Sequence, residues 1–172
     1  MIRTLLRDGE IDFDGTWYQA RDCELLPRPT RPGGPPLMIG SKGPRMLRIA
    51  LPHVGSWNVW FSDTGNRPDG VPALRELVDE ACREVGRDPA AVERTVAVSV
   101  RLAGGAGRVQ TDDGQDPVLP LQGSVEEMTA AMHAYAAEGI GHVQLVMDPI
   151  TRESIEAFAP VLVALDRTAE RN

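Results

Sequence analysis

Apolar positions along the chain alternate between short strand-like runs and stripes at helical spacing. The run from Leu37 to Ile39 is followed by a glycine-rich turn and by apolar positions at helical spacing between 46 and 51. A second strand is predicted over 54–60 and a third over 96–102. In the third, Val96, Val98, Val100 and Leu102 face one way and Ala97, Ser99 and Arg101 the other. This order predicts strands and helices in regular alternation.

Three further helices complete the alternation. They are predicted from Pro72 to 85, from Ser124 to 138 with a Ser124–Glu127 capping box, and from Thr151 onward, with a bend or break at Pro160. A strand over 142–147 precedes the last of them. Their expected buried positions are Leu74, Leu77, Val78, Ala81 and Val85; Val125, Met128, Met132 and Tyr135; and Ile155, Phe158, Leu162 and Leu165. The pattern predicts an α/β fold with about four β/α units.

One domain is expected over residues 1–172. Residues 1–34 form a leading segment: a helix end, a hairpin over 11–26 that turns at Asp14-Gly15, and a proline-rich connection over 27–36. Residues 35–172 hold the four β/α units. A long loop from Ala103 to Gly123, which includes the run from Gly104 to Arg108, predicts a lid or an irregular excursion.

Composition excludes several function classes. A formal net charge of −7, a pI near 5.0 and the lack of a basic run argue against nucleic-acid binding. No apolar stretch approaches the roughly 18 residues of a membrane-spanning helix, and the first residues do not form a signal peptide. Cys23 and Cys82 form no disulfide framework, which fits the cytoplasm. The three histidines have no metal-ligand spacing, so no metal is expected.

The turn from Gly40 to Arg45 carries the clearest chemical signal. Gly40-Ser41-Lys42-Gly43 follows a strand, and Pro44 occupies the first position of the next helix. Such a turn presents free N–H groups, and Ser41, Lys42 or Arg45 adds side-chain donors, which suits a phosphate. The alternative is an ordinary βα turn that uses glycine for its backbone.

A family resemblance rests on this stretch and its surroundings. The chain resembles the luciferase-like flavin or deazaflavin oxidoreductases through Phe13 to Tyr18, Leu25 to Pro29 and Ala137 to Leu145. The densest match comprises Pro35, Pro36, Ile39, Gly40, Gly43, Pro44, Arg45, Met46, Leu47, Arg48, Ala50, Trp57 and Asn58. It differs from the family pattern in Gly55-Ser56, where Asp-Gly is usual, and in Ser41-Lys42, which adds a cation beside the expected phosphate.

The resemblance implies the second half, strands five to eight, of a TIM-type (β/α)8 barrel. It implies FMN or coenzyme F420 as cofactor, a small organic substrate, and hydride transfer or monooxygenation. The implied cofactor-binding residues are Gly40, Ser41, Lys42, Gly43, Arg45, Trp57 and Asn58. The residues nearest the reacting carbon come mostly from the first half-barrel, so catalytic residues are not assigned and the chain alone is expected to be inactive.

Several alternatives remain open. Trp57 is equally explained by core packing and Asn58 by a satisfied turn amide. Asp148 and Arg152 lie at the expected barrel mouth, although Thr151 to Glu153 also makes a good helix start. A half-barrel leaves strand edges and an apolar inner face uncovered, so we expect a homo-oligomer or a separate first half-barrel as partner. The alternative function is a non-catalytic half-barrel that binds flavin weakly or serves in oligomerisation.

Overall fold

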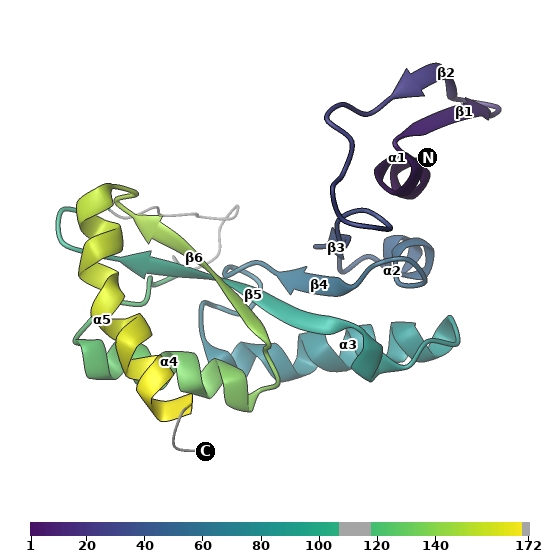
Figure 1. Cartoon of the computed structure of the whole chain (residues 1–172). Helices are drawn as coiled ribbons and strands as arrows, with labels where there is room; N and C mark the ends of the chain where they lie inside the picture. Colours follow the sequence, from purple (N-terminus) through teal and green to yellow (C-terminus); the bar gives the residue numbers. More distant parts are fainter. Residues whose placement is uncertain (107–117, 170–172) are drawn as a thin grey trace.

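The computed structural model describes residues 1–106 and 118–169 (Figure 1). The elements in chain order are α1 (Ile2–Asp8), β1 (Glu10–Asp14), β2 (Gln19–Glu24), β3 (Met38–Ile39), α2 (Pro44–Ala50), β4 (Ser56–Val59), η1 (Pro68–Gly70), α3 (Val71–Glu84), η2 (Pro89–Ala91), β5 (Glu93–Arg101), α4 (Val125–Ala137), β6 (His142–Asp148) and α5 (Arg152–Ala169). Residues 107–117 of the predicted 103–123 loop lie outside the described part.

A four-stranded parallel sheet in the order β3-β4-β5-β6 forms the centre of the fold. Each pair of neighbouring strands is joined through one α-helix, and α3, α4 and α5 lie on one side of the sheet (Figure 1). Ile39 is paired with Trp57, Val59 with Val96, and Arg101 with Asp148. The α/β alternation predicted from the sequence is therefore confirmed, although β3 has only two residues and β5 begins three residues earlier than expected.

The two faces of the sheet differ in chemistry. The face toward the helices is apolar, and Val96, Val98 and Val100 of β5 are fully buried there. Thr95 and Ser99 alternate with them and belong to the opposite face. The core comprises Leu47, Leu51, Val54, Trp57, Val59, Val71, Val78, Cys82, Val92, Val96, Val98, Val100, Met128, Met132, Tyr135, Ile140, Met147, Phe158 and Val161. The period-two pattern thus identified the buried face correctly.

The helices follow their local signals with three exceptions. Pro44 opens α2, and the Ser124–Glu127 capping box begins α4, both as predicted. Leu77, however, is 41% exposed on α3, where Cys82 takes part in the core instead. Helical spacing predicts an apolar stripe that is broader than the surface the helix buries. The prediction that Leu77, at the side of this stripe, is buried was therefore wrong.

The last helix differs from the prediction in two ways. Ile155 and Leu162 are more than half exposed, because α5 packs through Ser154, Phe158 and Val161. The helix also continues through Pro160, so the break that was one of the two predicted outcomes there does not occur. Pro160 is exposed, so the carbonyl group that loses its N–H partner is on the solvent side, where water can bond it.

The sheet is curved toward its polar face. Met38 on β3 and Gln144 on β6 come from the two outer strands, yet the Met38 Sδ lies 4.0 Å from the Gln144 Nε2. The same sulfur lies 4.0 Å from the Thr95 Oγ1 of β5. Strands are about 4.8 Å apart in a sheet, so this contact between outer strands requires a concave inner face.

Asn66 extends the hydrogen bonding of β5 beyond the end of β4. Its side-chain Oδ1 accepts from the Ser99 N–H at 2.9 Å, and its Nδ2 donates to the Ser99 and Leu119 carbonyl groups at 2.9 and 3.0 Å. Leu121 then bonds β5 through Ser99 and Arg101. The loop after β4, expected to be simply polar, is therefore anchored by a buried amide.

The leading segment lies at the β3 end of the sheet (Figure 1). Strands β1 and β2 form the antiparallel hairpin expected over 11–26. Arg28 links it to α1, donating to Glu10, Glu24 and the Asp8 carbonyl group at 2.9–3.0 Å. Gly34 has φ of +81°, and a Cβ there would lie 2.4 Å from the Leu6 carbonyl oxygen. Glycine therefore permits the proline-rich segment to pack on α1.

We expect Asn66→Gly to destabilise the fold. Asn66 has φ of +57°, which glycine adopts freely, so the variant removes the side-chain hydrogen bonds without backbone strain. Leaving the buried Ser99 groups without Asn66 should lower the free energy of unfolding by about 2–4 kcal/mol, measured by urea denaturation. An unchanged unfolding free energy would show that Leu121 alone holds this edge.

We expect Tyr135 to make stability fall at high pH. Tyr135 is 1% exposed, and burial raises its pKa from 10.0 to about 12. Because the folded-state pKa is the higher one, the neutral phenol stabilises the fold fully below pH 10, and this contribution is lost as pH rises toward 12. Tyr135→Phe should remove a decline of about 2 kcal/mol in unfolding free energy. Tyr18→Phe, at a position 75% exposed, is the control and should leave the decline in place.

Candidate functional site

The carboxyl ends of the four parallel strands meet at one edge of the sheet. The chain leaves β3 at Gly40, β4 at Trp60, β5 at Leu102 and β6 at Pro149. Ligands of parallel α/β sheets bind outside this edge, because the connecting loops and helix N-termini gather there. The turn predicted to hold a phosphate, 40–45, is one of these connections.

The turn itself is open. Gly43 has φ −71° and ψ 128°, an extended conformation that most residues adopt, so its glycine is not required by the backbone. Its N–H donates to the Ser41 Oγ at 3.3 Å. A Cβ added at Gly40 or Gly43 would meet no atom closer than 3.6 Å. The turn therefore leaves space for close approach of a ligand to its backbone.

Charge at the turn comes from Lys42. Its ammonium group pairs with the Asp63 carboxylate of the loop after β4, and the two side chains are 49% and 25% exposed. The helix that follows, α2, has only seven residues, so its dipole is small. Arg45 is exposed and makes no side-chain hydrogen bond or ion pair within the described residues. Any phosphate at this turn would compete with Asp63 for Lys42.

Trp57 supports the turn from behind. Its side chain is 1% exposed among the core residues on the helix side of the sheet, and its indole Nε1–H donates to the Ser41 carbonyl group at 2.8 Å. Core packing and the position of the turn are therefore linked in one residue. A direct contact between Trp57 and a ligand would need the indole to leave this packing.

Asn58 lies on the other, concave face. Its Oδ1 accepts from the Thr95 Oγ1 at 2.8 Å, and Thr95 is itself beside Met38. Asn58 of β4, Thr95 of β5 and Gln144 of β6 thus form a polar row beside Met38 of β3, on the inner face that we expected to be apolar. Asn58 and Trp57, neighbours in sequence, thus point to opposite sides of the sheet, as strand geometry requires.

The two positions weighed at the last strand are separated by the structure. Arg152 is a surface residue whose Nε donates to the Glu156 Oε1 at 2.8 Å, one turn along α5, and its side chain is 85% exposed. Asp148 is half-buried and follows the same face as Arg101, its partner in the register. Of the two, Asp148 is the one at the concave face.

Two residues near this edge were not singled out from the sequence. Trp60 follows β4, is 40% exposed and lies with its ring centroid 4.9 Å from that of Phe61. Arg101 ends β5 on the concave face and is half-buried. Period-two alternation had already separated Arg101 from the core valines, and this was the signal that could have identified it.

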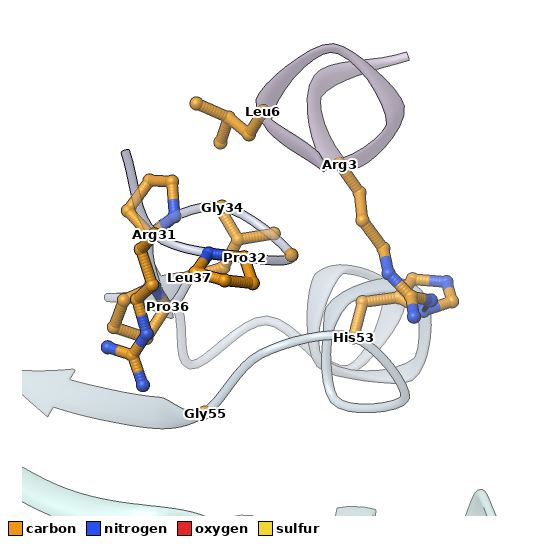
Figure 2. A pocket seen from close by; sticks show the side chains of 11 residues that line it. Arg3, Leu6, Arg31, Pro32, Gly34, Pro36, Leu37, His53 and Gly55 are labelled. Atoms are coloured by element: carbon orange, nitrogen blue, oxygen red, sulfur yellow. Dashed lines mark hydrogen bonds between the residues drawn. The ribbon is translucent and has the colours of Figure 1, made fainter. Parts of the chain in front are cut away.

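A second concavity lies at the opposite, amino end of the strands. It is formed by α1, the proline-rich segment and the turn before β4. Figure 2 shows Arg3 directed toward His53, where its Nη1 lies 3.2 Å from the Nδ1, while Arg31 lies on the far side of the pocket. This pocket lies at the amino end of β3, whereas the 40–45 turn follows its carboxyl end.

Two features are absent from the described ranges, 1–106 and 118–169. Within them, no three His, Cys, Asp or Glu side chains gather as a metal site would require. Nor does any helix there combine the length and apolarity needed to cross a membrane.

Several solved structures are similar to this chain in fold. An F420-dependent secondary alcohol dehydrogenase in complex with an F420-acetone adduct has a TM-score of 0.66 at 18% identity, over 95% of this chain and 58% of that one. The coenzyme F420-dependent tetrahydromethanopterin reductase of Methanopyrus kandleri has a TM-score of 0.66 at 14% identity, over 93% of this chain and 58% of that one. A riboflavin lyase with modified FMN has a TM-score of 0.62 at 14% identity, over 93% of this chain and 49% of that one.

The chain thus spans only about half to three fifths of these structures. At such identities the likeness establishes the fold. Among curated proteins, no sequence matches the chain. The model of one protein family, described as luciferase-like monooxygenase, matches residues 1–112, which is more than half of the chain and includes the 40–45 turn. The chain therefore belongs to the luciferase-like monooxygenase family.

Proposed function

We propose that the chain is the cofactor-phosphate-binding half of a flavin- or F420-dependent oxidoreductase, built from strands five to eight of a (β/α)8 barrel. The observation that carries the proposal is the open 40–45 turn, at the carboxyl end of β3, in a member of this family. The relatives in fold that bind F420 or modified FMN support the choice of cofactor. A small organic substrate would complete the reaction.

The residues present fit a phosphate. Gly40 and Gly43 leave their surroundings open, the Ser41 hydroxyl is at the turn, and Lys42 supplies the positive charge. The first bond of α2 is donated by Leu47 to the Gly43 carbonyl group, so the Arg45 and Met46 N–H groups have no acceptor within the helix. Trp57 would hold this set in place through Ser41 rather than contact the ligand.

The cofactor ring would supply the hydride chemistry, and the protein would position it. A phosphate contact far from the reacting centre binds ground state and transition state about equally, so it contributes affinity rather than rate. The residues nearest the reacting carbon are expected on strands one to four. We therefore propose that residues 1–172 bind cofactor but need a first half-barrel for turnover.

A partner is also part of the proposal, either a first half-barrel or a second copy of this chain. The outer edge of β6 is unpaired among the described strands, and an apolar groove beside it is lined by Met132, Phe158 and Leu162. Exposed strand edges and apolar grooves favour association. The polar character of the concave face means that the edges, not that face, would drive it.

The cofactor titration tests the proposal directly. Gly43→Val should bind FMN and F420 at least tenfold more weakly than wild type, measured by fluorescence titration, because its side chain occupies the space a phosphate needs. Its φ and ψ suit valine, so the free energy of unfolding should stay within about 1 kcal/mol. Failure of the wild-type chain to bind either cofactor would favour the non-catalytic alternative.

The Lys42–Asp63 pair leads to a second prediction, in which cofactor affinity increases. Asp63→Asn removes the carboxylate that competes with phosphate, so FMN and F420 should bind up to about fivefold more tightly, as fits an exposed pair worth 0–1 kcal/mol. Lys42→Met should weaken binding. Arg48→Met, on α2 and paired with Glu84 at 3.8 Å, is the charge-matched control and should leave affinity unchanged. Equal affinities in all three variants would remove Lys42 from the site.

A further inference from the structure

Arg101 lies at the carboxyl edge of the sheet, where ligands of parallel α/β sheets bind. It is the last residue of β5, one of the two inner strands, and shares the concave face with Thr95 and Ser99. Its backbone is fixed on both sides, by a hydrogen bond from its N–H to the Leu121 carbonyl group and by pairing with Asp148 on β6. The guanidinium group therefore starts from a rigid strand at the carboxyl edge.

The side chain of Arg101 has no partner within the described residues. Its Nε is buried and makes no hydrogen bond, and no ion pair joins it to Asp148 or to another described carboxylate. The other described arginines without a side-chain partner are exposed and can bond water; they are Arg31, Arg45, Arg83 and Arg167. Arg94 also has a buried, unbonded Nε, but its other nitrogens bond Val92 and Asp79.

A guanidinium donor without a partner is costly, because it loses water and gains nothing in return. Gln144 repeats the pattern on the same face: its Oε1 is buried without a hydrogen bond, and its Nε2 has only the sulfur of Met38 at 4.0 Å. Gln144 pairs with Ala97, four residues before the Arg101–Asp148 pair. The concave face thus holds an unused cationic donor and an unused amide acceptor.

We propose that Arg101 binds an oxyanion, a carboxylate or a phosphate carried by the substrate, with Gln144 accepting a hydrogen bond from a donor elsewhere on the same molecule. Arg101 and the 40–45 turn follow different strands, β5 and β3, with β4 between them, so we assign this anion to the substrate rather than to the cofactor phosphate. The planar guanidinium suits both oxyanions because it can donate two parallel hydrogen bonds. The assignment to a substrate rests on the proposed function.

The probe is inorganic phosphate in one arm and acetate in the other, each added to the full chain against chloride at equal ionic strength. The readout is the arginine Nε–Hε resonance in ¹H–¹⁵N spectra, assigned to Arg101 by its loss in Arg101→Lys. We expect a saturable shift of this resonance with one anion and not with chloride. Saturation by phosphate identifies a phosphate ester as the substrate class, and saturation by acetate a carboxylic acid.

Arg83→Gln is the matched control, since Arg83 is an exposed arginine without a partner on α3. Anion affinity, followed in these variants through the backbone amide resonances of β5 and β6, should be unchanged in Arg83→Gln and at least about tenfold lower in Arg101→Gln, the loss expected for a hydrogen bond to a charged group. If Arg101→Gln does not fold, the presence or absence of a saturable shift at the Arg101 resonance of the wild-type chain still decides the question. No saturable shift with either anion, or the same shift at the Arg83 resonance, would overturn the proposal.

The cofactor titrations separate this inference from the proposed function. Gly43→Val should lose FMN and F420 affinity while the Arg101 resonance still responds to the anion. If neither cofactor binds wild type but the Arg101 response persists, the proposed function fails and the anion position stands. If cofactor binds and Arg101 shows no response, the proposed function stands and this inference fails.

Discussion

Hydrogen bonding along both edges of β5 holds this fold together. Along one edge, β6 pairs with β5 from Thr95 to Arg101. The other edge is shared, because β4 ends at Val59 and the Asn66 amide and Leu121 continue the bonding toward Arg101. A buried strand tolerates few unpaired backbone groups, so this replacement allows β4 to be short while β5 reaches the carboxyl edge at full length. The position of Arg101 depends on it.

Trp57 connects this core to the candidate cofactor turn. An indole buried against the helices has one polar atom to satisfy, and it does so at the Ser41 carbonyl group. The turn is therefore held from its buried side, and its outer side carries the exposed groups, Lys42 and Arg45. A site built in this way keeps its backbone in position whether or not a ligand is bound.

The concave face is polar, and its central residues Thr95 and Ser99 are buried although α3, α4 and α5 lie on the other face of the sheet. Parallel strands are usually apolar on both faces because helices cover both. Here the helices lie on one face, and the other carries Asn58, Thr95 and Gln144. Of these, Thr95 donates a hydrogen bond to Asn58. Such a face suits contact with a polar ligand. The apolar surface left at β6 and α5 is instead placed at the sheet edge, where a further β/α unit or another chain would add.

The sequence by itself determined the order of elements, the buried face of β5, the Pro44 and Ser124 helix starts and the position of the glycine turn. These follow from local backbone preferences and from side-chain periodicity, which depend on near neighbours in the chain. Only the tertiary structure decided that Trp57 faces the core and supports Ser41, that Lys42 meets Asp63, and that Asn66 replaces a strand. Each of these is a contact between residues distant in sequence. The exposure of Ile155 and Leu162, and of Leu77, was decided there as well, because helical spacing defines a stripe but not how much of it a neighbour covers.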